Sequence, residues 1–220
     1  ENIDEGWTRW LLEQYEFRFS SIADAEIRAG TLRARYDAII LPNAAGERLT
    51  AGNSADAVPA EYAGGLGQAG VEALKAFVQE GGTLVCLDQS CTLAIDALDL
   101  PVRDVARAAG DKLFCPGSIL RLQLDPSQPL SYGMPQRTAG FFASSSAYEP
   151  TGALQTIAIY GPSDLLLSGW LEGGEAIAGR GAVVQASVGA GRVVLRRFRV
   201  QHRGQSLATF RFLFNALFTT

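Results

Sequence analysis

The stretch Gly81–Leu98, GGTLVCLDQSCTLAIDAL, decides how the rest of the chain folds. Two glycines that end a preceding helix lead into an apolar run, and a short polar loop then leads into a second run with helical spacing. This order predicts a buried strand over 83–88 and a helix over 91–98. In an α/β protein, ligands bind at the carboxyl end of such a strand, and a nucleophile would sit at the turn after it.

Upstream of this stretch, helical and strand patterns alternate. Asn2 is a good N-cap, acidic residues follow it, and Trp7, Leu11 and Tyr15 recur at helical spacing. The apolar run Tyr36–Leu41 is stopped by Pro42, as in a buried parallel strand. We expect helices over 4–15, 24–29 and 68–80, strands over 17–22 and 36–41, and a long loop over 43–66.

Downstream, strand patterns become more frequent. A hairpin is indicated where two apolar runs flank Val188–Gly191, and the chain closes on an apolar helix. We expect helices over 102–108 and 209–218, one helical turn over 175–178, and strands over 118–124, 140–144, 154–160, 165–170, 182–187 and 193–198.

These elements favour one α/β domain over residues 1–220. Strands and helices that alternate first, with a hairpin and a helix at the end, predict a three-layer α/β/α sandwich with a mostly parallel sheet and an antiparallel extension. Such a fold normally opens with the strand at the centre of its sheet, whereas this chain opens with a helix. We therefore expect the opening strand to be missing and the chain to be a fragment of a longer protein.

Composition narrows the classes of partner. Of the 220 residues, 47% are hydrophobic and 19% are charged, so a sizeable core is expected and bulk disorder is not. The net charge of −4 argues against nucleic acid as a partner. No apolar run reaches the ~18 residues that a membrane span needs.

The arginines form one cluster late in the chain. Like charges at alternate strand positions usually share an exposed face, so a solvated or ion-paired face is expected, with anion binding as the alternative. The members of this cluster are Arg192, Arg196, Arg197, Arg199 and Arg203.

Cysteine and histidine are too few for several kinds of site. Three cysteines do not make a disulfide framework, although a bridge between Cys91 and Cys115 is left open, and Cys86 is expected in the core. His202 is the single histidine and there is no CxxC pair, which excludes the usual zinc sites. We expect no metal and no cofactor within this chain.

Seven segments, taken in order, carry a family resemblance. They are Asp4–Trp10 (DEGWTRW), Gly81–Val85 (GGTLV), Pro129–Pro135 (PLSYGMP), Asp164–Trp170 (DLLLSGW), Gly191–Val194 (GRVV), Gln201–Gln205 (QHRGQ) and Phe214–Ala216 (FNA). Together they resemble the C-terminal domain that follows the peptidase domain in a group of bacterial zinc-carboxypeptidase-like proteins. The likeness spans nearly the whole chain.

The resemblance implies a fold, a parent protein and a partner. The family's domain is similar in fold to class I glutamine amidotransferases, which are flavodoxin-like, and an apolar strand precedes it. The parent would be a secreted or periplasmic metallopeptidase, and the partner of this chain would be the upstream peptidase domain. A carboxypeptidase zinc site needs two histidines, so that site must lie outside this chain.

The amidotransferase pattern is incomplete around the candidate nucleophile. Such an elbow places glycines two residues before and after its cysteine, whereas Gln89 and Leu93 flank Cys91. His202 follows the last predicted strand, as the partner histidine should, but Gly204 stands where an acid would orient it.

The candidate binding crevice lies between residues 88–91 and the loop 199–205. Asp88 is expected to cap the following helix, and Arg203 could pair with it across the crevice. The residues assigned to the crevice are Asp88, Gln89, Ser90, Cys91, His202 and Arg203.

Three functions follow from these residues. The first is a non-catalytic accessory domain that docks against the peptidase or binds a small molecule or peptide. The second is a cysteine-dependent hydrolase or amidotransferase-like enzyme in which His202 activates Cys91. The third is a carbohydrate- or peptide-binding module with Phe141, Phe142 or Tyr148 as a stacking rim.

Overall fold

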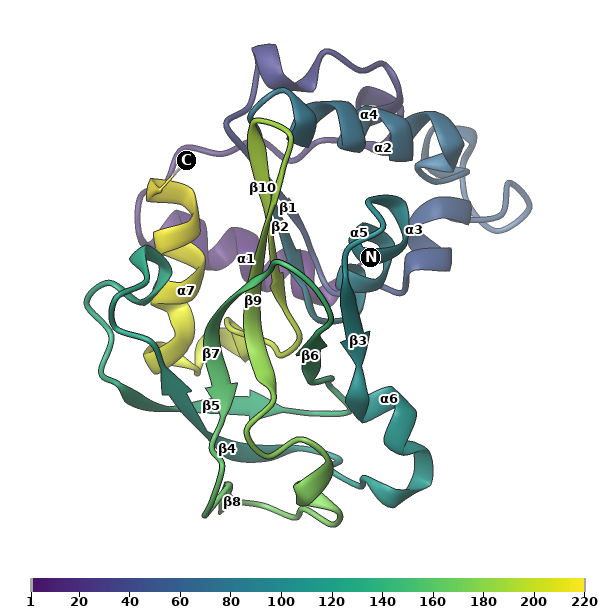
Figure 1. The fold of residues 1–220 in the computed structure, drawn as a ribbon. Coiled ribbons are helices and arrows are strands. Elements are labelled where there is room, and N and C mark those ends of the chain that lie inside the picture. Colours follow the sequence, from purple (N-terminus) through teal and green to yellow (C-terminus); the bar gives the residue numbers. More distant parts are fainter. Residues whose placement is uncertain (1, 220) are drawn as a thin grey trace.

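The strand expected at 83–88 lies inside a mixed sheet of ten strands (Figure 1). A computed structural model describes residues 2–219. The main path of the sheet runs β1-β2-β10-β9-β7-β4-β5; off this path, β6 pairs with β9, β3 pairs with β6, and β8 pairs with β4. The strands are β1 (Ala38–Leu41), β2 (Thr83–Leu87), β3 (Val102–Asp104), β4 (Ser118–Leu124), β5 (Arg137–Phe142), β6 (Tyr148–Pro150), β7 (Gln155–Tyr160), β8 (Leu166–Ser168), β9 (Gly181–Val188) and β10 (Gly191–Arg196).

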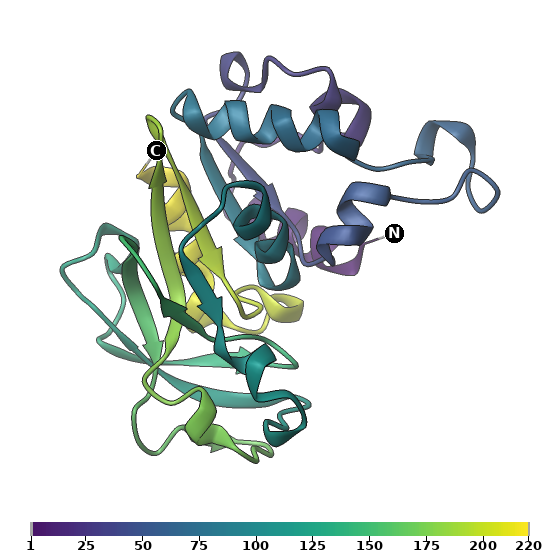
Figure 2. The ribbon, with the colours of Figure 1, turned by 45° about the vertical axis from the view of Figure 1, so that its right-hand side comes forward.

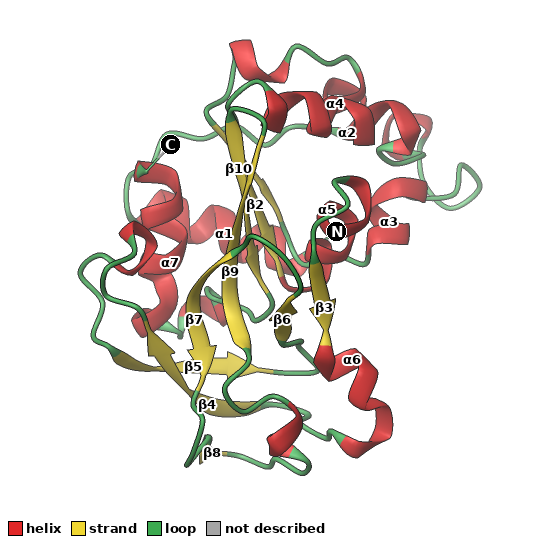
Figure 3. Cartoon of the chain, in the orientation of Figure 1, coloured by secondary structure: helices red, strands yellow, loops and turns green. Residues whose placement is uncertain are grey.

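Helices cover both faces of the parallel strands β1, β2 and β10, whereas the region of β4, β5, β7 and β8 is mostly strand and loop (Figure 3). The helices are α1 (Ile3–Gln14), α2 (Asp24–Arg28), α3 (Gly46–Ala51), α4 (Gly67–Gln79), α5 (Cys91–Ala97), α6 (Val105–Ala109) and α7 (Leu207–Phe218). Short 3₁₀ turns occupy Leu32–Ala34, Ala60–Tyr62, Asp88–Ser90, Gly110–Lys112, Pro129–Ser131, Gly174–Ala176 and His202–Gly204.

The alternation of side chains along β2 divides the core in two. Val85 and Leu87 face a cluster that includes residues of α1 and α7, while Leu84 and Cys86 face a cluster that includes residues of α2, α4 and α5. Figure 1 shows α7 on one side of these strands and α5 on the other. A strand buried on both faces needs apolar residues at every position, which explains the continuous run that the sequence shows.

The hairpin of β9 and β10 is confirmed, and Gly191 fixes how it meets α4. A Cβ on Gly191 would lie 2.2 Å from the carbonyl oxygen of Val78 and 2.3 Å from that of Gly82. Only glycine therefore allows β10 to approach the turn between α4 and β2 this closely. This approach brings β10 beside β2 and places both carboxyl ends together.

Most predicted helices are confirmed to within a few residues, but the predictions for three other segments are wrong in part. The segment 43–66 contains α3 as well as loop, and the part between α3 and α4 projects from the body (Figure 2). The helix expected over 102–108 is the strand β3 followed by α6, because the Asp104 side chain accepts from Arg107 N at 3.0 Å and starts the helix there. Strand 140–144 is shifted to Arg137–Phe142, and β6 was not anticipated.

The strand expected over 17–22 is absent from the described residues. No neighbouring strand pairs with it there, and Phe17 instead stacks on Phe214 of α7 with ring centroids 5.1 Å apart. The sheet is also less parallel than expected. The pairings of β1 with β2 and of β2 with β10 are parallel, whereas every other strand pairing among the described residues is antiparallel.

Candidate functional site

The strained position of the elbow is occupied by Asp88, three residues before Cys91. Asp88 directly follows β2 and has a φ of +51°, which is uncommon for a residue other than glycine. Ser90 holds this turn: its hydroxyl accepts from Leu87 N at 2.9 Å and bonds the Leu41 carbonyl at 3.0 Å. The turn therefore joins the carboxyl ends of β1 and β2, which is the usual place for a ligand in such a sheet.

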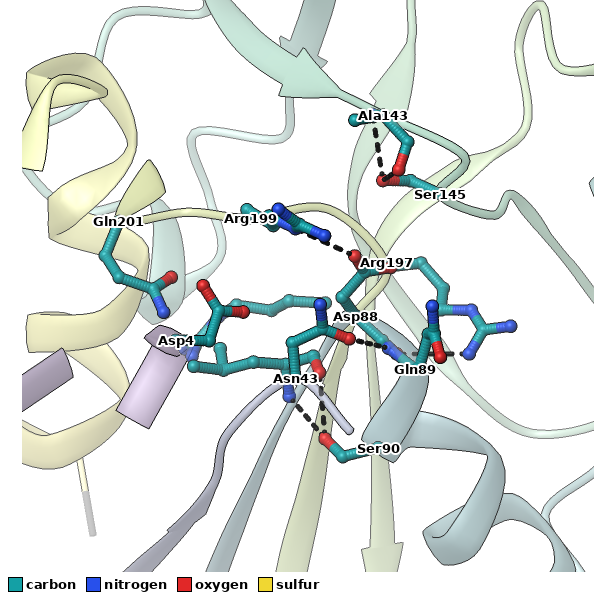
Figure 4. Close-up of polar contacts among 12 residues, drawn as sticks. Asp4, Asn43, Asp88, Gln89, Ser90, Ala143, Ser145, Arg197, Arg199 and Gln201 are labelled. Carbon is teal, nitrogen blue, oxygen red and sulfur yellow. Dashed lines mark hydrogen bonds and ion pairs between the residues drawn. The ribbon is translucent and has the colours of Figure 1, made fainter. Parts of the chain in front are cut away.

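Asp88 is enclosed by two arginines that follow β10 (Figure 4). Its side chain is 2% exposed, with a carboxylate oxygen 3.5 Å from Arg199 Nε, while Arg197 Nη1 donates to its backbone carbonyl at 3.1 Å. Burial raises the pKa of Asp88 from 3.8 to about 7, against the opposing effect of both arginines. The predictions that Asp88 caps a helix and pairs with Arg203 are wrong, because its partner is Arg199 and no cap bond forms.

Cys91 lies inside the core rather than at the surface of the elbow. It is 0% exposed, and its sulfur lies 3.4 Å from the Cys86 carbonyl oxygen and 3.6 Å from that of Arg196. Burial raises the pKa of the Cys91 thiol to about 11. Since the thiolate is the nucleophilic form, this position suppresses reactivity at neutral pH.

The three cysteines are all free and buried, so the bridge left open between Cys91 and Cys115 does not form. Cys86 is a core residue, as expected, and its thiol pKa is raised well above the ordinary value, chiefly by burial.

His202 packs by ring stacking instead of hydrogen bonding. Its ring lies on Phe141 with centroids 3.9 Å apart and an interplanar angle of 19°. Burial, followed by the charges of Arg199 and Arg203, lowers the pKa of His202. Arg203 is exposed, in the same 3₁₀ turn, and has a φ of +49°. The structure therefore brings Arg199 to the elbow, while His202 and Arg203 belong to the turn beside it.

The arginine cluster is ion-paired at Arg197 and Arg199, as one form of the prediction had it, but it does not form one exposed face. Arg196 is fully buried, and Arg197 is 8% exposed. Arg197 forms an ion pair with Asp104 at 2.9 Å and donates to the Thr92 hydroxyl at 3.0 Å. Alternate strand positions share a face, but here both faces of β10 are covered, so both arginines are enclosed.

A second polar cluster links α1 to the loop after β10. Gln201 is fully buried and donates to the Thr8 hydroxyl at 3.0 Å, and that hydroxyl donates to the Asp4 carbonyl at 2.8 Å. Burial raises the pKa of Asp4, which lies close to Gln201 in Figure 4. Two of the segments that carry the family resemblance, 4–10 and 201–205, therefore meet beside the elbow.

A large cleft of about 1370 Å³ opens beside the elbow. Gln89 is the one residue assigned to the crevice that lines it, and Arg197 lines it too. The serines 144–146 and Phe114 were not anticipated, because they come from segments far from the elbow in sequence. The Ser/Gly-rich composition before Tyr148 was the one available signal.

The aromatic rim lies at other residues than predicted. Phe142 and Tyr148 are 1% and 0% exposed, and Phe141 is covered by His202, so they form no rim. Phe114 and Trp170 are 46% and 60% exposed instead, with ring centroids 5.6 Å apart in an edge-to-face arrangement. Phe114 belongs to the cleft, which gives the cleft one exposed aromatic side chain.

Comparison with known proteins identifies the fold but no family. No family model matches the sequence, and no curated protein matches it either. The cytoplasmic proteins STM3548 of Salmonella typhimurium and STM1381 of strain LT2 are similar in structure, with TM-scores of 0.61 and 0.62 and identities of 12% and 13%. The alignments cover 97% and 100% of this chain and 85% and 87% of those chains. A ThuA-like protein from Bacteroides uniformis matches at a TM-score of 0.48, 11% identity and 97% and 80% coverage.

These comparisons correct one expectation. A secreted or periplasmic location was implied by the family resemblance, and it is contradicted because both similar Salmonella proteins are described as cytoplasmic. Within residues 2–219, no helix is both long enough and apolar enough to cross a membrane.

Proposed function

We propose that this chain is a non-catalytic, ligand-binding accessory domain with a three-layer α/β/α fold like that of class I glutamine amidotransferases. The observation that carries the proposal is the enclosure of Cys91. Its thiol is fully buried with two carbonyl oxygens in hydrogen-bond reach, and burial raises its pKa to about 11, so the elbow lacks an available sulfur nucleophile.

The proposed fold assignment is supported by the layout of the parallel strands. β1, β2 and β10 carry helices on both faces, and β2 leads through a strained turn into α5. The cleft lies at the carboxyl ends of these strands, where open α/β sheets bind ligands. A binding role therefore needs no chemistry at Cys91.

The proposed parent is a zinc-carboxypeptidase-like protein. The support is the order of the seven sequence segments, two of which, 4–10 and 201–205, meet through Thr8 and Gln201. The partner would be the peptidase domain of the longer protein. Its zinc site would lie there, since this chain has one histidine.

The alternative is a cysteine hydrolase in which His202 activates Cys91. The geometry argues against it, because His202 stacks on Phe141 and the Cys91 thiol points at backbone carbonyl oxygens. A general base must lie within hydrogen-bond reach of the proton that it removes. The described contacts of His202 and Cys91 are with other residues and not with each other.

The test is peptide hydrolysis by the longer protein with Cys91→Ala. We expect hydrolysis to stay within about twofold of wild type and chelation of zinc to abolish it, because the reaction would use the zinc site of the parent. Cys115→Ala is the matched control, since Cys115 is also a buried free cysteine. Loss of hydrolysis in the Cys91 variant alone, with its thermal unfolding unchanged, would contradict the proposal.

A further inference from the structure

Arg197 joins the wall of the cleft to a polar network behind it. Its Nη1 and Nη2 groups donate to Asp88, Thr92 and Asp104, but its Nε has no hydrogen-bond partner among the described residues. Arg197 lines the cleft and is 8% exposed. The Nε atom itself is closed off from the cleft, so Arg197 contributes to the wall through the network behind it and offers no donor of its own to a ligand.

The charges around the cleft argue against an anionic ligand. The positive charge of Arg197 is already balanced by Asp104 at 2.9 Å. The exposed carboxylates of Glu47, Asp96 and Asp99 on the lining outnumber Arg107, the one lining cation without an ion pair among the described residues. A field of this sign repels phosphates and carboxylates, so the ligand is expected to be neutral.

The floor of the cleft offers groups that both donate and accept. Gln89 and Ser144 are exposed there, and Ser144 is held at a φ of +48°. Ser145 and Ser146 lie beside them, with the Ser146 hydroxyl bound to Asp104 at 2.7 Å. Hydroxyl and amide groups of this kind match the alternating donors and acceptors of a ligand rich in hydroxyls.

An aromatic face and the size of the cleft complete the match. Phe114 presents an exposed ring at the cleft, supported edge-to-face by Trp170. Aromatic rings bury large apolar faces, and the C–H face of a sugar ring is flat and apolar. The volume of about 1370 Å³ exceeds the ~300–1,000 Å³ typical of small-molecule pockets, which favours a ligand of several units.

We propose that the cleft binds a neutral oligosaccharide, with a sugar ring on Phe114 and sugar hydroxyls bonded to Gln89 and Ser144. The inference rests on the proposed ligand-binding function and names its ligand class. A short uncharged peptide would also pair with Gln89 and Ser144, but it has no flat C–H face to stack on Phe114.

The test is calorimetric titration of the full chain with cellotetraose, maltotetraose, mannotetraose, chitotetraose and a blocked Ala-Gly-Ser-Ala peptide. We expect at least one tetrasaccharide to bind with a Kd below about 1 mM and the peptide not to bind. Phe114→Ala should weaken that binding about tenfold, because it removes the stacking face. Tyr132→Ala is the matched control, since Tyr132 is 77% exposed and does not line the cleft.

The outcomes separate the two proposals. Binding of the peptide without any tetrasaccharide would overturn the oligosaccharide inference and leave the ligand-binding function standing. Saturable tetrasaccharide binding that Phe114→Ala leaves unchanged would overturn the assignment to this cleft. If no probe binds, the oligosaccharide inference fails, while the proposed function is decided separately by the hydrolysis test with Cys91→Ala.

Discussion

Replacing Asp88 by Asn should stabilise the protein at alkaline pH by on the order of 4 kcal/mol, the largest gain that we expect from a single substitution. Burial raises the pKa of Asp88 from 3.8 to about 7, so the folded state holds its proton far more tightly than the unfolded state. A difference of one in pKa corresponds to about 1.4 kcal/mol, and the ionised carboxylate therefore destabilises the fold.

The sign follows from proton binding. Between about pH 4 and pH 7 the folded state keeps the proton that the unfolded state has lost, so stability falls as pH rises through this window. Below it, both states are protonated and the destabilisation is absent. Above about pH 7, the ionised Asp88 therefore lowers the free energy of unfolding. An amide at this position carries no charge and does not cause this loss.

The measurement is urea unfolding of wild type and Asp88→Asn at about pH 5 and about pH 8.5. The variant should gain most at the higher pH and show a flatter dependence on pH. Asp56→Asn is the control, because Asp56 is exposed and should change little at either pH. A variant that is equal to wild type or weaker at the higher pH would show that the ionised Asp88 is not a burden on the fold.

Replacing Arg196 by Met should also stabilise the protein, by about 1–4 kcal/mol at neutral pH. Arg196 is fully buried, and only its Nη2 has a partner, the Phe212 carbonyl of α7. Its Nε and Nη1 have none within the described residues. Burial lowers the pKa of Arg196 to about 9, which reflects how strongly the site disfavours the charge.

Methionine fills a similar volume without a charge or unused donors, so the core keeps its packing. Arg196→Ala removes the same charge but leaves a cavity, and we expect it to be at least about 2 kcal/mol less stable than the Met variant. Denaturant unfolding of the three proteins decides the matter. A Met variant clearly below wild type would mean that the guanidinium contributes more through Phe212 than its burial costs.

Local patterns predicted the elements that depend on local chemistry. The two glycines at 81–82 and the apolar run after them gave β2, and the turn Val188–Gly191 gave the hairpin of β9 and β10. The segment 17–22 has a strand pattern as well, yet whether it forms a strand depends on a neighbour, and none pairs with it in residues 2–219.

The sequence predicted where the candidate site lies, but not which side chains form its contacts. The crevice between residues 88–91 and 199–205 is real in that Asp88 meets Arg199. The sequence could not reveal that Asp88, and not Cys91, takes the strained φ. That depends on the exact residue at which β2 ends, and sequence patterns do not fix strand ends to one residue. Arg197 pairs with Asp104, which lies 93 residues away in the sequence. The spacing of nearby residues therefore could not predict this ion pair or the burial of Arg197.

The most direct test of the central claim, that the elbow holds no reactive thiol, is alkylation of the folded protein by iodoacetamide, mapped by mass spectrometry. We predict that Cys91 stays unmodified near pH 8.5, where a free thiol with a pKa of about 8.5 reacts readily, and that all three cysteines react once guanidinium unfolds the chain. Stoichiometric modification of Cys91 at neutral pH, with the fold retained, would contradict the account.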